Sequence, residues 1–238
     1  MLYSTLGSFV ILIFYPLIIS AVPAPAVFRW IRANGPGPIP PGIMETLEIG
    51  GRWFYLVRFG IMGAFLAAWM KMYAIPMGAI GIPPKNWARS CELSAVALAF
   101  LVILRIVFQR LSPRTRLVLT AHGLSRGPVA TWLYILVVGG ITEEVWRALC
   151  LVAMQGTWNS YMSGVLLSSI AFAYANVAGL PGRVSGYLEE VVWEIILGVV
   201  LAGLFLTSGT VFVPYVSGLG FNIFNLYFIR RLLAHMAV

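Results

Sequence analysis

The fold class is decided by residues 128–154, which read PVATWLYILVVGGITEEVWRALCLVAM. The only charged side chains in this stretch are Glu143, Glu144 and Arg147. A helix needs roughly 20 apolar residues to cross the hydrocarbon core of a bilayer, and this stretch is long enough. Ionisable side chains inside such a helix are costly and usually have a partner or a function. The stretch therefore predicts a membrane-spanning helix that carries a polar site.

The rest of the chain has the same apolar character. Of its 238 residues, 60% are hydrophobic and 10% are charged, and the mean hydropathy is +0.90. Soluble domains carry about 25% charged residues, so we predict an all-α membrane protein with about seven transmembrane helices. The glycine pair Gly139-Gly140 leaves open whether 128–154 is one helix or two shorter segments. The predicted spans are 5–27, 53–74, 92–109, 128–154, 160–180, 188–207 and 210–229.

Basic residues divide unequally between alternate loops, and cytoplasmic loops of membrane proteins carry the excess of Lys and Arg. One set of loops holds Arg29, Arg32, Arg52, Arg110, Arg114, Arg116, Arg126, Arg183, Arg230 and Arg231, whereas the opposite set holds Lys71, Lys85 and Arg89. We therefore expect the N-terminus outside and the C-terminus in the cytoplasm. The net charge of +8 then reflects loops beside membrane lipids and not a nucleic-acid partner.

We divide the chain into peripheral helices with basic cytoplasmic loops (1–127), a core (128–229) and a cytoplasmic tail (230–238). No Lys or Arg precedes the first apolar run, Phe9 to Ile19, and basic residues follow it instead. This order favours a retained signal anchor over a cleaved signal peptide.

Polar residues recur on the core spans and point to one candidate site. Glu143 and Arg147 are four residues apart, so they share a helix face and can form an ion pair. In the expected topology, four further polar residues lie in the cytoplasmic half of the following spans. These are Asn176, Glu190, Glu194 and Asn222. We expect the four core spans to line one polar cavity reached from the cytoplasm.

Structural roles compete with a site role for these residues. Glu190, with Glu189 before it, can simply stabilise a helix N-terminus. Asn222 and Asn225 can be interhelical hydrogen-bond partners, and the Glu143–Arg147 pair can be purely structural. Aromatic residues near the polar cluster can line an apolar slot, although core packing explains them at least as well. They are Trp146, Tyr174, Trp193, Phe221 and Phe224.

Further residues are expected to serve the membrane and the packing. Arg58, Lys71 and Arg105 lie near predicted span ends and should extend their cationic groups to the interface. Gly63 with Ala67, and Gly198 with Ala202, have the spacing of close helix packing.

Residues 141–149 read ITEEVWRAL, which resembles the first motif of the CPBP family (also called CAAX protease or Abi) of intramembrane metalloproteases. The stretch SSIAFAYAN, residues 168–176, is similar to the family's second motif, in which a Phe is followed four residues later by a His. The two last spans resemble the third motif and its approach through Gly198, Gly203, Thr207, Gly209, Pro214 and Asn222. The resemblance covers roughly residues 78 to 225. It implies a four-helix core formed by spans four to seven.

The departures from this family pattern concern the hydrolytic groups. Aligned on Arg147, Glu143 takes the place of the second family Glu, and Thr142 takes the place of the first, which the family uses as general base. Asn176 stands where the second motif has its histidine, and Gly218 stands where the third has one. What the resemblance retains is Glu143, Arg147, Phe172 and Asn222.

We therefore expect a catalytically degenerate family member that acts as an accessory, assembly or structural subunit. Its site would be the cavity at Glu143, Glu144, Arg147, Asn176 and Asn222, with Glu190, Glu194, Trp146, Phe172 and Tyr174 as binding residues. Another membrane protein, or an isoprenoid, prenylated or pigment ligand, would occupy it, and no cofactor is expected. Short loops and the resemblance suggest a bacterial inner membrane.

Two other functions stay open. One is an active endopeptidase with a divalent metal held by Glu143, Glu144 and Glu194, where an all-carboxylate set would favour Mg²⁺, Mn²⁺ or Ca²⁺ over Zn²⁺. The other is a proton-coupled transporter that uses the same glutamates.

Overall fold

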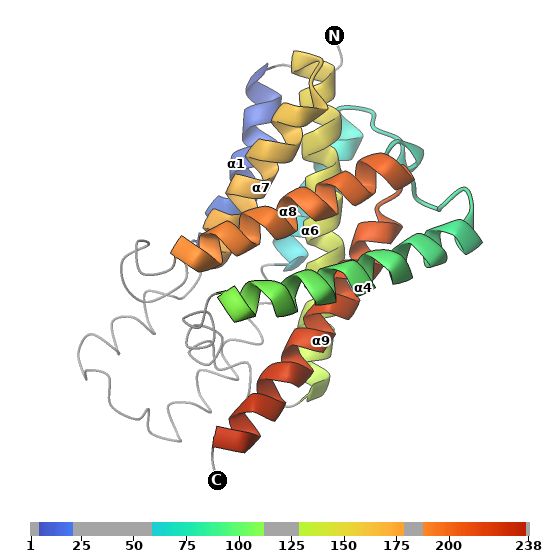
Figure 1. Ribbon diagram of the computed structural model, residues 1–238. Coiled ribbons are helices and arrows are strands. Elements are labelled where there is room, and N and C mark those ends of the chain that lie inside the picture. The colour runs from blue at the N-terminus through green and yellow to red at the C-terminus, as the bar shows by residue number, and fades with distance from the viewer. Residues whose placement is uncertain (1–4, 21–58, 112–128, 179–187, 237–238) are drawn as a thin grey trace, which may run out of the picture.

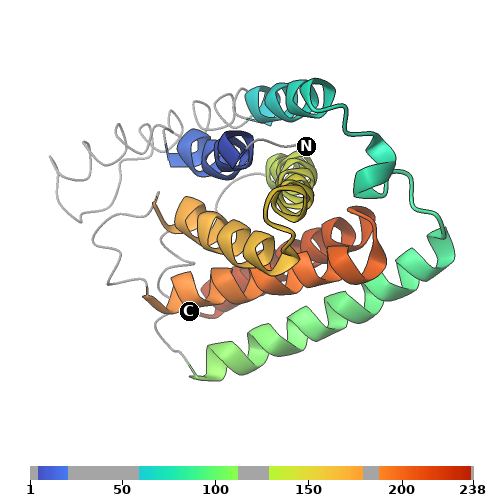
Figure 2. The same ribbon diagram turned by 90° about the horizontal axis from the view of Figure 1, so that it is seen from above.

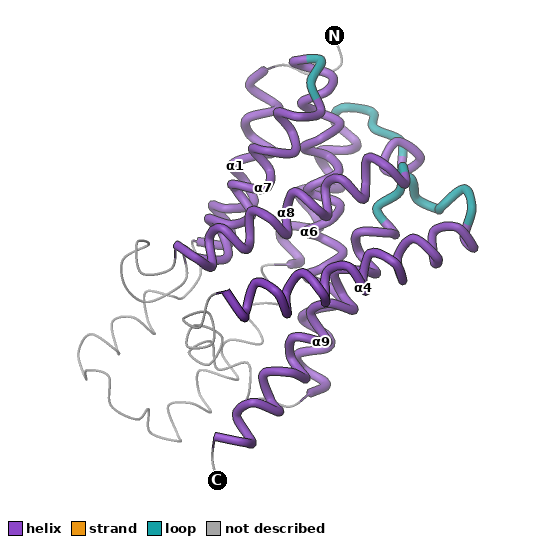
Figure 3. The backbone as a smooth tube through the Cα atoms, in the orientation of Figure 1, coloured by secondary structure: helices purple, strands orange, loops and turns teal. Residues whose placement is uncertain are grey.

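The computed structural model describes residues 5–20, 59–111, 129–178 and 188–236. Within these ranges the chain is helical, with loops and no strand (Figure 3). Most helices are long enough for three or more turns, as the apolar runs predict. In chain order they are α1 (Thr5–Ser20), the helix Phe59–Met72, the 3₁₀ helix η1 (Met77–Ile80), α4 (Trp87–Leu111), α6 (Val129–Trp158), α7 (Tyr161–Ala178), α8 (Leu188–Ser208) and α9 (Phe212–Met236).

Each predicted span overlaps one of these helices, and the prediction of an all-helical chain is confirmed for the described residues. Residues 21–27 and 53–58 of the first two predicted spans lie outside the described residues. Helix α6 runs unbroken through Gly139 and Gly140, so the stretch that decides the fold is a single helix of 30 residues. Among the described residues, Trp87–Phe108 in α4 and Val191–Ser208 in α8 are long and apolar enough to cross a membrane.

Helix α6 lies at the centre of the molecule and contacts α1, α7, α8, α9 and η1 (Figure 1). Seen from above, α1 and the helix Phe59–Met72 lie on one side of α6, and α8, α9 and α4 lie on the other (Figure 2). Helix α4 packs mainly on α9 and also touches α8. The core of the predicted 128–229 unit is therefore enclosed by helices from the first half of the chain.

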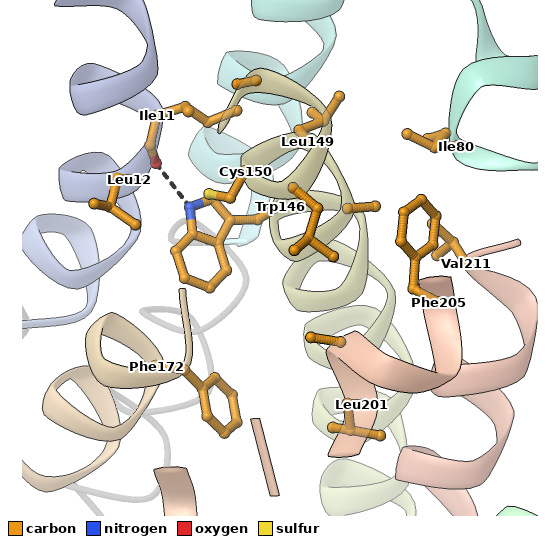
Figure 4. Packing of buried hydrophobic residues seen from close by; sticks show 14 of the residues in the cluster. Ile11, Leu12, Ile80, Trp146, Leu149, Cys150, Phe172, Leu201, Phe205 and Val211 are labelled. Carbon is orange, nitrogen blue, oxygen red and sulfur yellow. Dashed lines mark hydrogen bonds between the residues drawn. The ribbon is translucent and has the colours of Figure 1, made fainter. Parts of the chain in front are cut away.

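Buried side chains fasten α1 to α6 (Figure 4). Trp146 is fully buried, and its indole Nε1–H donates to the Ile11 carbonyl oxygen at 2.7 Å. The contact between α1 and α6 is polar at one end, where the Ser8 and Thr157 hydroxyls lie 2.6 Å apart. A buried indole N–H usually finds an acceptor, and here the acceptor comes from a neighbouring helix.

The segment around η1 is hydrogen-bonded to the turn between α8 and α9. Thr210 Oγ1 donates to the Gly81 carbonyl oxygen at 2.6 Å, and the Val211 N–H donates to the Ile80 oxygen at 3.0 Å. Gly81 has φ +70°, and a Cβ there would collide with the Gly209 carbonyl oxygen. This position therefore requires glycine both for its backbone conformation and for its close approach.

The two predicted packing glycines behave differently. At Gly198, a Cβ would lie 2.9 Å from Ser169 Cβ, so α7 and α8 approach closely there, as expected. At Gly63, no atom lies within 4 Å of where a Cβ would be among the residues the structure describes. The packing role expected of Gly63 therefore has no partner among the described residues.

Candidate functional site

A buried ion pair lies in the middle of α6. Arg147 Nε donates to Glu144 Oε2 at 3.2 Å, and Arg147 Nη2 donates to Glu144 Oε1 at 3.3 Å. Both residues are buried, Arg147 completely. The two parallel contacts give the fork-like geometry that fixes a guanidinium against a carboxylate. The pairing offsets part of the cost of removing the two charges from water.

The spacing argument did not predict this pair. It pointed to Glu143, four residues before Arg147, whereas the structure shows Glu144, three residues before, in contact with the guanidinium. Both spacings bring side chains to one helix face, so the sequence does not choose between the two acids. Glu143 is half-buried beside this pair.

The same guanidinium links α6 to α7. The Arg147 Cζ atom lies 4.5 Å from the centroid of the Phe172 ring, and Phe172 is buried. Such a cation–π contact contributes most when it is removed from water. The first two resemblance motifs, on α6 and α7, are thus in direct contact through Arg147 and Phe172.

One turn further along α7, a second polar contact joins α7 to α8. Asn176 Nδ2 donates to Glu194 Oε2 at 3.1 Å, and both side chains are half-buried. Asn176 and Glu194 are two of the four residues expected to line one polar cavity, and they are in contact. Because the amide donates to this carboxylate, Asn176 acts here as a hydrogen-bond donor between helices.

The position predicted for the Arg105 side chain is wrong. Arg105 was expected to reach the membrane interface, but its side chain is 1% exposed and its Cζ lies 4.7 Å from the centroid of the Trp193 ring. Trp193 also contacts Phe108 and Phe221, with ring centroids 5.2 and 5.8 Å away. Arg105 is one turn beyond the buried Leu101, so the two residues lie on the same face of α4.

The other predicted residues do not all join this cluster. Trp146, Trp193 and Phe221 are core residues, as the packing interpretation held. Tyr174 is 56% exposed, so the expected role in lining an inner slot is wrong. It lies on the outward face of α7, two residues from the buried Phe172. Asn222 lies half-buried on α9. Glu190 lies in α8, but its side chain is outside the described residues.

The sequence also suggested a metal site and a central cavity. Among the described side chains, no group of three or more His, Cys, Asp or Glu residues is close enough to hold a metal ion. Glu144 and Glu194 contact Arg147 and Asn176 respectively. A hollow of about 380 Å³ is lined by residues between Ala67 and Met77, away from the polar cluster.

The basic residues behind the predicted orientation lie mostly outside the described ranges. They include Arg29, Arg32, Arg52, Arg114, Arg116, Arg126 and Arg183. Arg110, Arg230 and Arg231 lie in described helices, but their side chains are not described.

Comparison with known protein families finds one relationship. The family model described as type II CAAX prenyl endopeptidase Rce1-like matches residues 125–224. This range contains α6, α7, α8 and the first half of α9, together with Glu144, Arg147, Asn176 and Glu194. No curated protein and no solved structure matches the chain. The match over residues 125–224 and the apolar helices together indicate a membrane protein whose second half is similar to the Rce1-like CAAX prenyl endopeptidases.

Proposed function

We propose that this protein is a non-hydrolytic member of its family that acts as an accessory, assembly or structural subunit in the membrane. Its Rce1-like region retains the polar scaffold of α6, α7 and α8 and would use it to position a bound partner. The partner is another membrane protein, or a lipid-like ligand such as an isoprenoid or a prenylated chain.

The hydrogen bond between Asn176 and Glu194 is the observation that carries this proposal. The family resemblance expects histidine at position 176, where the imidazole would bind metal or move a proton. An asparagine amide cannot act as a general base near neutral pH. Here the amide instead ties α7 to α8, so the position has a structural role in this chain.

The position of Gly218 supports the same conclusion. The resemblance expects a second histidine there, and glycine offers no ligand. A Cβ at Gly218 would lie 3.7 Å from Leu201 Cδ2, so the position points toward an apolar side chain of α8. Glu144 is likewise in contact with Arg147. Neither position therefore offers a free group for hydrolysis in this arrangement, since Gly218 has no side chain and Glu144 pairs with Arg147 within α6.

For the membrane setting we propose a bacterial inner membrane, with the N-terminus outside and the C-terminus in the cytoplasm. The ten basic residues on one set of loops, against three on the other, support this orientation. Cysteine substitution in either set, followed by labelling with a membrane-impermeant maleimide, tests it. Labelling of Lys85→Cys but not Arg114→Cys in intact cells is the expected pattern.

An active endopeptidase is the second candidate, because the family description names that activity. It would need a site rebuilt from Glu143, Glu144 and Glu194. Carboxylates bind Mg²⁺, Mn²⁺ or Ca²⁺ more readily than Zn²⁺, so a divalent ion of that class would be expected.

Co-purification and metal analysis of the same preparation distinguish the two functions. The chain is purified in mild detergent, and its metal content, lipids and accompanying proteins are identified. We expect a defined membrane protein or isoprenoid-type lipid at a constant ratio to the chain. An Arg147→Ala preparation, in which the scaffold is broken, should lose that component.

A stoichiometric divalent metal that disappears in Glu143→Gln would support the endopeptidase instead. Recovery of the chain alone, without partner or ligand, would contradict the accessory role.

A further inference from the structure

The hollow at the end of the helix Phe59–Met72 is separate from the polar cluster. Its volume is about 380 Å³, and its walls come from the last turn of that helix, the following turn and the start of η1. Most of its lining is apolar, including Ala67, Met70, Ile75 and Met77. Lys71 is the one charged residue among the lining residues. The hollow therefore combines an apolar surface with a single amino group.

The surrounding segment is strongly cationic. Residues 71–91 contain Lys71, Lys85 and Arg89 and no acidic residue. All three basic residues are exposed. In Figure 1 this segment forms the connection that leads from the helix Phe59–Met72 through η1 to α4. The next acidic residue along the chain is Glu92 in α4, so the segment itself presents positive charge only.

Large apolar side chains are exposed beside these cations. Met72, Met77 and Trp87 are 67%, 58% and 54% exposed. Exposed aromatic and apolar groups next to Lys and Arg are typical of a segment at the bilayer interface. Trp87 also begins α4, whose stretch to Phe108 is long enough to cross the membrane. In a bilayer, a segment of this composition would lie at the level of the lipid headgroups, and the hollow would lie there with it.

We propose that this hollow binds a phospholipid with an anionic headgroup. An acyl chain lies against Ala67, Met70 and Ile75, and the Lys71 amino group contacts the lipid phosphate. The charge of the segment selects an anionic lipid over a zwitterionic one, because each Lys or Arg near the surface adds a favourable interaction with negative charge. The inference does not depend on the function proposed for the polar cluster.

The test is native mass spectrometry of the full chain, released from detergent after incubation with palmitoyl-oleoyl-phosphatidylglycerol or with the matching phosphatidylcholine. The expected result is one retained phosphatidylglycerol, with affinity above that for phosphatidylcholine. Lys71→Gln should lower the phosphatidylglycerol affinity by about fivefold. Ala67→Phe, which fills the hollow, should abolish the selective site.

Lys85→Gln is the matched control, because Lys85 is an exposed lysine of the same segment that does not line the hollow. It should leave binding nearly unchanged. Equal losses in Lys71→Gln and Lys85→Gln would show general surface attraction only and overturn the site. Equal affinity for the two lipids, or retention in Ala67→Phe, would also overturn it. So would retention of a second copy of the chain in place of lipid.

Discussion

Two buried arginines in this protein lie in similar surroundings but differ in how the chain holds them. Arg147 of α6 and Arg105 of α4 are both almost completely buried, and each places its guanidinium against an aromatic ring of another helix. Arg147 lies inside the family-matched region and has an acid partner three residues before it. Arg105 lies upstream of that region, and its ring partner, Trp193, is on a helix far along the chain.

The difference shows that helices outside residues 125–224 also pack against the family-matched region. Arg147 connects helices within the region, whereas Arg105 brings α4 onto it from outside. Two further upstream contacts have the same character, namely Ile11 with Trp146 and Gly81 with Thr210. We therefore expect changes in the upstream helices to destabilise the family-matched core.

Arg147→Ala should have the largest effect. It leaves the Glu144 carboxylate buried without its cation, which costs about 3–5 kcal/mol in comparable ion pairs. Thermal unfolding in detergent measures it. The double variant Arg147→Ala/Glu144→Gln removes the stranded charge and should recover part of the loss. If the single and double variants unfold at the same temperature, the ion pair is not what stabilises α6.

Gly81→Ala should come next. The new methyl group collides with the Gly209 carbonyl, and the residue must keep a positive φ, so we expect a loss of about 3 kcal/mol. Gly209→Ala is the matched control, because Gly209 has φ +67° with open space around its Cβ position. The control separates backbone strain from the collision. Equal losses would mean that the close approach to the α8–α9 turn contributes nothing.

Arg105→Met should destabilise the protein by about 2 kcal/mol, because it removes a desolvated cation from the Trp193 ring while keeping most of the side-chain volume. Lys85→Met, at an exposed position, should change stability by less than about 0.5 kcal/mol. Comparison of the two melting curves tests whether α4 is held by this contact. A melting temperature of Arg105→Met at or above that of the wild type would contradict it.

Asn176→Leu should have the smallest effect, about 1 kcal/mol, because one hydrogen bond between half-buried groups is lost. Glu194→Gln retains an acceptor for the Asn176 amide and should cost less. Both are measured by thermal unfolding against the wild type. A large loss in Asn176→Leu would indicate that this contact has a greater role in the core than the geometry suggests.

Much of the fold follows from local features of the sequence. Apolar runs near 20 residues predicted the helices, and short spacings within α6 showed that Arg147 needs an acid beside it. The sequence could not show whether Glu143 or Glu144 pairs with Arg147, because residues three and four positions apart lie on the same side of a helix. The expected topology placed Asn176 and Glu194 in the same half of neighbouring spans, which is compatible with the hydrogen bond between them.

Contacts between distant helices could not be predicted in this way. Arg105 lies on a helix that is apolar on every side, so periodicity does not show which face is buried. The exposed Tyr174 illustrates the same difficulty on α7, because its neighbours in sequence are apolar whether they face lipid or protein. The hydrogen bond between Thr210 and Gly81 depends on a turn formed much later in the chain.

The central proposal, a non-hydrolytic role for the region that matches the Rce1-like model, is tested most directly by a cleavage assay. The purified chain in liposomes is mixed with a prenylated CAAX-type peptide, beside a histidine-bearing protease of the family as positive control. The account predicts no cleavage by the wild-type chain above that by Glu143→Gln or by empty liposomes. Cleavage that the wild type shows and that Glu143→Gln abolishes would contradict it.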